Sequence, residues 1–397
     1  MVISQNVECD VCGKIYFTRI GVGHDSYQKH YFDCIDCEQS IGVAVRANPP
    51  SAHIEALENC TLGGFDDSKT IINLHANYCF PANKYHEAGY FISIHEGQRL
   101  FKYVRKVPGK FQGIDTQFDI PNAKELWKNV ARIRKLSSHQ DKERLQRKQI
   151  NAYNLQRSKF KHGGCDCTNA EDVFLEFYDS MFYPRVNDIS KPVIDLIDNL
   201  FSNNKLDEFH YFYKQNLMNE GEQRYIATIS TYFDQRDILG QIAYRARISD
   251  DEVEDLVVGS KNFNDIKLYY GEVYEALTSQ FTILACLNNL EAGRNYDQFL
   301  QMTLNKYIKD VEKSNKCNPF KDNPRFSKFT AGLDSSLRNG SHHASIWREN
   351  DIIMYKSGGT GAKRAIPYSL YLYQCNLLTI ALVALHIIEL HIQSKYS

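Results

Sequence analysis

The chain has 397 residues, of which 43% are hydrophobic and 24% are charged. This length predicts two or three domains of ordinary size rather than one small core, and the composition excludes fibrous and wholly disordered proteins. The formal net charge is −1, so binding to a polyanion would depend on a local basic patch rather than on the charge of the whole protein.

The N-terminus and the cysteines indicate the cellular compartment. The first residues, MVISQNVECDVC, lack the basic start and the apolar run of a secretory signal, so we expect a cytoplasmic protein. The sequence contains 11 cysteines. In a reducing compartment, closely spaced cysteines predict metal ligands rather than disulfides, and an odd number argues against a complete disulfide framework.

Four of the cysteines form two Cys-x-x-Cys pairs near the N-terminus. Cys9 and Cys12 make the first pair, Cys34 and Cys37 make the second, and the β-prone residues between the pairs predict a hairpin. Two such pairs can hold one tetrahedral Zn²⁺, and four protein ligands would close its coordination sphere. The spacing therefore predicts a structural Zn²⁺ in a zinc ribbon over residues 1–45. The alternative is a set of reduced cysteines that bind no metal.

Residues 46–165 are expected to form a mixed α/β region. Short β-prone runs alternate here with Pro and Gly, and they predict strands, including one in the run GYFISIHEG at residues 89–97. The remaining Cys and His residues of this region follow no regular ligand spacing. We therefore expect scattered core or surface residues rather than a second zinc site.

The mixed region ends in a basic segment that is expected to be helical. The helix can begin at Pro121, and Gly163-Gly164 ends the pattern. Between Trp127 and His162 there are eleven Lys or Arg residues and two acidic residues. Such segregation of charge is typical of proteins that bind phosphates, and a solvated helix face is the equally weighted alternative. The residues predicted to bind RNA are Arg132, Arg134, Lys135, Arg144, Arg147 and Lys148.

Beyond residue 165 the sequence is helical almost to its end. Residues 166–204 predict a helical connector, and residues 205–397 predict an antiparallel helical bundle with short loops. Helices are expected near residues 188–203, 205–218, 221–248, 265–290, 295–314, 326–339 and 367–393. The expected fold class is a multidomain, mainly α protein, with a small β zinc ribbon, a mixed α/β middle region and a C-terminal helical bundle.

The last expected helix, residues 367–393, is long and apolar enough to cross a bilayer. The polar residues Gln374, Asn376 and His386 interrupt its apolar run. We therefore expect a helix that is buried in the bundle and has no membrane contact. Pro367 is expected in its first turn.

The segment SSLRNGSHHASIW, residues 335–347, brings an arginine and two histidines close together. An RNA strand can be cut without a metal ion if its 2′-hydroxyl attacks the neighbouring phosphate, which requires a base, an acid and a fixed positive charge. Histidine can act as base or acid because its pKa is about 6.5, and the guanidinium fork of arginine fits phosphate oxygens. Arg338 and His343 can supply these groups.

Helical geometry limits this pairing. Five residues along a regular α-helix turn a side chain by roughly 140°, so Arg338 and His343 would not share a face, whereas His342 would share a face with Arg338. A helix break at Gly340-Ser341 would resolve the conflict, because glycine permits the turn that swings His343 back. Asn339 could fix this turn by hydrogen bonds to the backbone.

At its C-terminal end the sequence resembles a known family. The run LRNGSHH is similar to the motif of HEPN domains, in which arginine and asparagine precede a histidine by a fixed spacing. ASIWRENDIIMYKSGG resembles the short variable or β-like insertion that follows this motif, and IPYSLYLYQCNLLTIALVALHIIEL resembles the final apolar helix of the family. HEPN domains are all-helical bundles, and many of them are metal-independent endoribonucleases. The resemblance extends from about residue 205 onward, and the motif region is its specific part.

The resemblance implies a role for each residue of the motif. Arg338 would be the phosphate-stabilising cation, His343 the acid or base, and Asn339 the residue that positions the turn. His342 occupies a free position of the motif, which leaves open which imidazole faces the substrate. Active clefts of this family form where two motifs meet across a two-fold axis, which implies a homodimer.

The function implied by the resemblance is a metal-independent endoribonuclease. It would cut RNA by 2′-hydroxyl attack and leave 2′,3′-cyclic phosphate and 5′-hydroxyl ends, in the manner of toxins or antiviral defence effectors. RNA would be its partner, and the zinc ribbon and the basic helix would hold the RNA backbone. The alternative is a non-catalytic adaptor that binds nucleic acid or a protein partner and dimerises through its helical domain.

Overall fold

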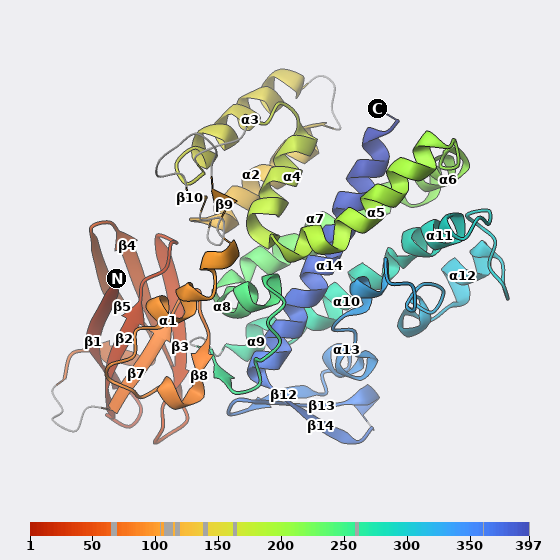
Figure 1. Ribbon diagram of the computed structural model, residues 1–397. Helices are drawn as coiled ribbons and strands as arrows, with labels where there is room; N and C mark the ends of the chain where they lie inside the picture. Colours follow the sequence, from red (N-terminus) through yellow and green to blue (C-terminus); the bar gives the residue numbers. More distant parts are fainter. Residues whose placement is uncertain are drawn as a thin grey trace.

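The computed structural model describes residues 1–64, 70–103, 105–106, 114–115, 120–137, 142–161, 165–258, 262–359 and 361–396. It contains an N-terminal β domain and a larger helical part that lie side by side (Figure 1). The expected combination of a β N-terminus with a helical C-terminal region is confirmed. The glycines predicted to end the basic helix lie outside the described residues.

The β domain consists of two sheets. The first sheet has the order β6-β1-β2-β7, with bounds Cys60–Leu62, Val2–Cys9, Ile15–Gly21 and Thr70–His75. The second sheet has the order β3-β4-β5, with bounds Tyr27–Asp33, Ser40–Asn48 and Ser51–Glu58. Side chains from both sheets form one apolar core, which includes Ile20, Val43 and Leu74.

This domain differs from the expected zinc ribbon in two respects. The hairpin predicted between the two cysteine pairs is wrong, because β2 pairs with β1 and β7, whereas β3 pairs with β4 in the other sheet. The boundary predicted at residue 45 falls inside β4. The unit is larger than expected because burial of the apolar faces requires both sheets.

The region after β7 connects the β domain to the helical part. Strand β8, Phe80–Pro81, pairs with β11, Leu256–Val257, from the helical part. The strand predicted at residues 89–97 is wrong, because helix α1 occupies Ile92–Gln98. Its buried residues, Ile92 and Glu96, are four positions apart on one helical face. Two short strands, Arg105–Lys106 and Ile114–Asp115, pair as β9 and β10.

Two helices replace the single basic helix that was predicted. Helix α2 spans Ala123–Ser137 and helix α3 spans Glu143–Arg157. Trp127 and Val130 of α2 are buried in the main core. Tyr153 of α3 is buried in the same core.

Eleven further α-helices, α4 to α14, follow in the described part of the chain. Those that pack in the bundle are α4 Ala170–Phe182, α5 Arg185–Ser202, α6 Asp207–Asn216, α7 Met218–Asp234, α8 Arg236–Arg247, α9 Phe263–Ile266, α10 Tyr269–Ser279, α11 Phe281–Glu291, α12 Leu304–Asp310, α13 Ser335–His342 and α14 Tyr368–Ser394. Helices α4 and α5 pack on α14, so the predicted connector belongs to the bundle.

Some predicted helices are divided or shortened. The helix expected at 221–248 is split at Gln235, and the helix expected at 265–290 is split at Gln280. At each split the backbone tightens, because the amide N–H three residues later donates to the carbonyl of the glutamine. The helix expected at 295–314 is reduced to α12.

Helix α14 runs through the centre of the helical part (Figure 1). It is long and apolar enough to cross a membrane, but 94% of its apolar window is buried within the protein. The expected buried helix is therefore confirmed. Pro367 is the N-cap of α14 and the last residue of β14, rather than a residue of its first turn.

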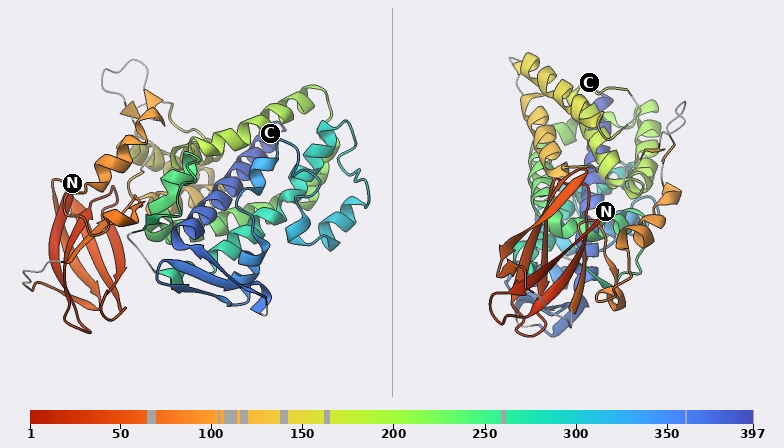
Figure 2. Two further views of the ribbon diagram at one scale, coloured as in Figure 1. Left: turned by 60° about the horizontal axis from the view of Figure 1, so that its bottom comes forward. Right: turned by 90° about the vertical axis from the view of Figure 1, so that its left-hand side faces the viewer.

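A small antiparallel sheet connects α13 to α14. Its strands are β12 Ile346–Glu349, β13 Ile352–Lys356 and β14 Lys363–Pro367, in the order β12-β13-β14. This sheet occupies the position expected for a β-like insertion. In the further views, α2 and α3 lie at one end of the helical part and this sheet lies at the other (Figure 2).

Candidate functional site

The four N-terminal cysteines lie together at one end of the β domain. Cys9 and Cys12 flank the turn from β1 to β2, and Cys34 and Cys37 flank the turn from β3 to β4. Their sulfur atoms all lie within 4.8 Å of one another. Each turn belongs to a different sheet, so the cluster joins the two sheets.

The distances between these sulfurs fit one tetrahedral metal ion. Cys9 Sγ lies 3.7 Å from Cys37 Sγ, and Cys12 Sγ lies 3.5 Å from Cys34 Sγ. A tetrahedral ion with metal–sulfur bonds of about 2.3 Å would separate its ligands by about 3.8 Å. The predicted ligand set is therefore confirmed as a possible metal site.

Hydrogen bonds to Cys34 favour its thiolate form, which is the form that binds a metal ion. The hydroxyl of Tyr16 donates to Cys34 Sγ at 3.0 Å, and the amide N–H of Ile35 donates to the Tyr16 oxygen at 2.8 Å. Burial raises the pKa of Cys34, but the bonds from Tyr16 and from the backbone N–H groups of Cys37 and Asp36 lower it to about 7. Metal ligation requires the thiolate, so these bonds favour binding.

Helix α13 carries the candidate catalytic motif without the expected break. Asp334 caps its N-terminus by accepting hydrogen bonds from the backbone N–H groups of Ser336 and Leu337. The helix then runs through Gly340-Ser341 to His342, and the chain turns only at Ala344, whose φ is 52°.

Gly340, the glycine of the motif, has a different structural role from the predicted helix break. A Cβ atom on Gly340 would lie 3.2 Å from Cβ of Tyr355. Glycine at this position therefore allows α13 to approach β13, and it does not serve as a helix break.

Arg338 is held by two partners. Its Nε donates to Oε1 of Glu275 on α10 at 2.6 Å, and a terminal nitrogen donates to the same oxygen. Its other terminal nitrogen donates to Oδ1 of Asn339 at 2.7 Å. Asn339 therefore orients the guanidinium, rather than fixing a turn as predicted. The Arg338 side chain is 30% exposed and that of Glu275 is 28% exposed, so both are partly accessible.

The two histidines have different surroundings. His342 lies one helical turn beyond Arg338 and faces α10, since a Cβ atom on Gly271 would lie 3.1 Å from Nε2 of His342. His343 is the exposed C-cap of α13. His342 is also exposed, and within the described ranges neither imidazole has a hydrogen bond or ion pair. The structure thus places Arg338 and His342 on one face of α13, and His343 on another.

Two charged residues near the motif were not predicted from the sequence. Glu275 lies on α10 next to Arg338, and Lys313 donates to Ser279 one turn further along α10. Burial lowers the pKa of Lys313, Glu275 opposes this shift, and the positive charges of Arg224 and Arg338 add to it. In the sequence, Glu275 could have been noticed as an acidic residue within the apolar pattern of residues 265–290.

The predicted RNA-binding residues lie on α2 and α3. The exposed ones are Arg132, Lys135, Arg144, Arg147 and Lys148. Arg134 differs from them, because its guanidinium forms two bonds with the carboxylate of Glu222 on α7, at 2.6 and 2.8 Å. Arg134 therefore attaches α2 to the bundle, and its fork is directed to Glu222 rather than to a phosphate.

The basic helices and the candidate catalytic motif lie far apart. Helices α2 and α3 are at the end of the molecule opposite α13 and the small sheet (Figures 1 and 2). A single RNA strand that contacted both would have to cross the helical part.

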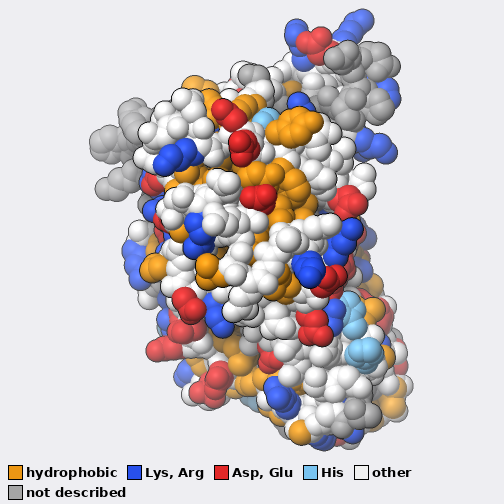
Figure 3. Space-filling model, turned by 90° about the vertical axis from the view of Figure 1, so that its right-hand side faces the viewer, with side chains coloured by type: hydrophobic (Ala, Val, Ile, Leu, Met, Phe, Trp, Pro, Cys, Tyr) orange, Lys and Arg blue, Asp and Glu red, His pale blue; other side chains and the backbone are white. Residues whose placement is uncertain are grey.

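Another surface of the helical part is apolar. Figure 3 shows hydrophobic side chains gathered across the middle of the face that carries α11 and α12, with histidine side chains below them. A cavity of about 600 Å³ lies in this region of the chain, and Leu300 at its edge is 90% exposed. Apolar patches of this kind mark surfaces that contact other molecules.

No protein-family model, no curated protein and no solved structure matches the chain. The functional assignment therefore rests on the residues described above.

Proposed function

We propose that the protein is a metal-independent endoribonuclease whose active cleft forms between the α13 helices of two identical chains. The observation that carries the proposal is the position of Arg338 and His342, which lie one turn apart on a partly exposed helix, with His343 at its end. An imidazole would take the proton of the 2′-hydroxyl, and Arg338 would stabilise the charged phosphorane.

The local charge supports the binding of phosphate at this position. Arg338 and Arg224 are each close enough to Lys313 to affect it electrostatically. Glu275 and Asn339 orient the guanidinium of Arg338. A preoriented cation loses little freedom when it binds the transition state, so Glu275 would act as a positioning residue.

A second chain would complete the site. Cleavage requires both a base and an acid, and the large cavities described for one chain are lined by other residues. Two α13 helices related by a two-fold axis would supply two arginines and two pairs of histidines to one cleft.

The four cysteines would hold a structural Zn²⁺, because thiolate ligands and tetrahedral spacing suit this ion. The ion would tie the two sheets of the β domain together. The exposed cations of α2 and α3 would bind the RNA backbone. A cytoplasmic location and a role as a toxin or an antiviral defence effector belong to the same proposal.

The test is cleavage of total RNA and transfer RNA by the purified protein and its variants. Arg338→Ala and His343→Ala should stop cleavage without loss of RNA binding, and His342→Ala shows which imidazole acts. Matched controls are Arg46→Ala, which removes another glutamate-paired arginine, and His53→Ala, which removes another exposed histidine. Cleavage at the parent rate in both Arg338→Ala and His343→Ala would remove the catalytic assignment.

Mixing the two inactive variants tests the shared cleft. Chains with Arg338→Ala and chains with His343→Ala, co-refolded as mixed dimers, should recover part of the activity, because each mixed cleft keeps one arginine and one His343. Mixtures that stay inactive although mixed dimers form would contradict a shared cleft.

The alternative function is a non-catalytic adaptor that dimerises through the helical bundle. The ion pair between Arg338 and Glu275 favours this alternative, because it also suits a purely structural arginine. An adaptor would bind RNA and leave it intact in the same experiment.

A further inference from the structure

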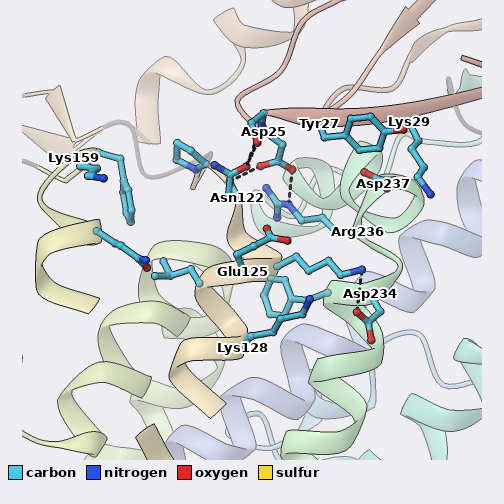
Figure 4. Close-up of a pocket in the computed structure, with 17 residues that line it drawn as sticks. Asp25, Tyr27, Lys29, Asn122, Glu125, Lys128, Lys159, Asp234, Arg236 and Asp237 are labelled. Carbon is cyan, nitrogen blue, oxygen red and sulfur yellow. Dashed lines mark hydrogen bonds and ion pairs between the residues drawn. The ribbon is translucent and has the colours of Figure 1, made fainter. Parts of the chain in front are cut away.

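The largest of the described cavities lies between the β domain and the helical part (Figure 4), and none of its lining residues belongs to α13. Its volume is about 840 Å³, which is within the range of small-molecule sites. Four segments line it, namely residues 25–29 before and in β3, 121–128 of α2, 156–160 at the end of α3, and 233–237 between α7 and α8.

Hydrogen bonds between these segments fix the shape of the cavity. Asp25 accepts from the backbone N–H of Asn122 at 2.6 Å, and Asn122 Oδ1 accepts from the N–H and the hydroxyl of Ser26 at 3.0 and 2.9 Å. The nearly buried Arg236 points toward Asp25, with Nε 3.6 Å from Oδ2 (Figure 4). The walls are therefore connected before any ligand binds, which reduces the cost of binding.

Cations from three elements line the cavity. Lys29 comes from β3, Lys128 from α2 and Lys159 from the end of α3. In the described part of the chain, none of these three ammonium groups forms an ion pair, whereas Lys124 is paired with Asp234 at 3.0 Å. The whole lining holds five cations and four carboxylates, a net charge of +1, so the unpaired ammonium groups leave the cavity slightly positive and favour an anionic group in the ligand.

The lining of the cavity also contains carboxylate hydrogen-bond acceptors and an aromatic ring. Glu125 and Asp237 line the same space, and no ion pair engages either carboxylate within the described ranges. The half-buried ring of Phe160 lies next to Lys159 in the lining. A simple anion would use the cations alone, whereas a ligand that also carries hydroxyl or amino donors can bind these carboxylates as well.

We propose that this cavity binds a nucleotide. Phosphate oxygens meet the ammonium groups of Lys128 and Lys159, the base rests on Phe160, and hydroxyl or amino groups donate to the carboxylates. The nucleotide is either a free molecule or the terminal nucleotide of an RNA strand. The site does not depend on the nuclease proposal, because none of its lining residues belongs to α13 and its occupancy can be measured without cleavage.

The test is direct binding to the full-length, metal-loaded protein by calorimetry. The probes are AMP, ATP, inorganic phosphate and a short 2′-O-methyl RNA, which cannot be cut by 2′-hydroxyl attack. We expect AMP or ATP to bind at least tenfold more tightly than phosphate if the source is a free nucleotide. Binding of the oligonucleotide alone would identify the end of a strand as the source.

Variants locate the binding in the cavity. Lys128→Gln and Lys159→Gln each remove one charge-assisted contact and should weaken binding about tenfold. Phe160→Leu keeps apolar volume but removes the ring face, so nucleotide affinity should fall about tenfold while phosphate affinity is unchanged. Lys214→Gln, an exposed lysine on α6, is the control and should bind like the parent.

Three results would overturn the proposal. The first is the absence of binding by both the nucleotides and the oligonucleotide. The second is equal affinity for phosphate and nucleotides, which indicates a simple anion site. The third is unchanged nucleotide affinity in the lysine variants, provided that their unfolding curves match that of the parent protein.

Discussion

Asp33 and Arg348 form an ion pair that connects the cluster of four cysteines to the strand after the candidate catalytic motif. The Arg348 terminal nitrogens lie 2.7 and 3.0 Å from the two carboxylate oxygens of Asp33. Asp33 directly precedes Cys34, and Arg348 lies in β12, which follows α13. The side chains are 23% and 17% exposed, so water screens this pair only in part.

This pair should contribute measurably to stability. Asp33→Asn and Arg348→Gln should each lower the free energy of unfolding by about 1–3 kcal/mol, because a partly buried charge loses its partner. The loss of unfolding free energy in the double variant should be smaller than the sum of the losses in the two single variants. Urea unfolding of the parent, the two single variants and the double variant gives the coupling energy of the pair. The exposed pair of Arg46 and Glu55 is the control, and its expected coupling energy is below about 1 kcal/mol. Strict additivity at Asp33 and Arg348 would show that the two elements are not coupled.

Metal binding should depend on the four clustered cysteines. The parent protein should bind one Zn²⁺ per chain, and Cys9→Ser should lose most of it and lower the unfolding temperature of the β domain, because the two sheets lose their shared ligand set. Cys165→Ser changes an exposed cysteine outside the cluster and should retain the metal. Elemental analysis and thermal unfolding measure both effects. If Cys9→Ser kept its full metal content, the assignment of the four cysteines as the metal ligands would be contradicted.

Glu275 should position Arg338 for catalysis. Glu275→Gln removes the charge that orients the guanidinium, so kcat should fall about tenfold while KM for RNA changes little. Glu272→Gln is the matched control, because Glu272 lies one turn away on α10 and bonds to Thr231 instead. Steady-state cleavage kinetics separate the two parameters. An increase in kcat for Glu275→Gln would show that the carboxylate restrains Arg338 rather than orienting it.

Arg132 and Arg134 should respond differently to the same substitution. Arg132→Gln removes an exposed cation, so it should weaken RNA binding. The slope of the logarithm of affinity against the logarithm of salt concentration should become shallower by slightly less than one. Arg134→Gln leaves Glu222 without its partner, and it should mainly destabilise the fold. Filter binding at several salt concentrations and urea unfolding measure the two effects. The reverse pattern would contradict the structural role of Arg134.

A buried carboxyl group in the bundle should make stability depend on pH. Burial raises the pKa of Glu389 from 4.5 to about 7, although hydroxyl bonds from Tyr225 and Tyr213 lower it. Since the folded pKa lies above the unfolded one, the protonated form stabilises the fold. This stability is fully present below pH 4.5 and is lost as pH rises through about 7.

The expected loss is about 3 kcal/mol, because each pKa unit corresponds to about 1.4 kcal/mol. Glu389→Gln resembles the protonated form and should flatten this part of the pH profile. Urea unfolding between pH 4.5 and 8 measures the difference between the two proteins. Parallel profiles would show that Glu389 does not titrate in this range.

Local patterns were sufficient to predict several elements. The cysteine cluster follows from ligand spacing, because each Cys-x-x-Cys pair forms its own turn. The buried helix α14 follows from a long apolar run interrupted by polar residues such as Asn376, which bonds inside the bundle to Tyr232 and the carbonyl of Leu239. The expected helix over residues 326–339 already contained Arg338 and Asn339, whereas His342 was expected beyond a break at Gly340-Ser341 and instead lies on the same helix.

Long-range partners account for the differences. The strand predicted at residues 89–97 is helical because Glu96 is buried against Arg245 on α8, a partner that no local pattern reveals. The role of Gly340 depends on β13, and the role of Arg134 depends on Glu222. Strand pairing between β2 and β7 likewise joins segments that are distant in the sequence.

The chemistry of the cleaved RNA ends tests the nuclease proposal most directly. The zinc-loaded protein is incubated with transfer RNA in excess EDTA, and the products are analysed by mass spectrometry. Attack by the 2′-hydroxyl, with histidine and Arg338 in place of a metal ion, predicts 2′,3′-cyclic phosphate and 5′-hydroxyl ends. Products with 3′-hydroxyl and 5′-phosphate ends, or RNA that stays intact until Mg²⁺ is added, would contradict it.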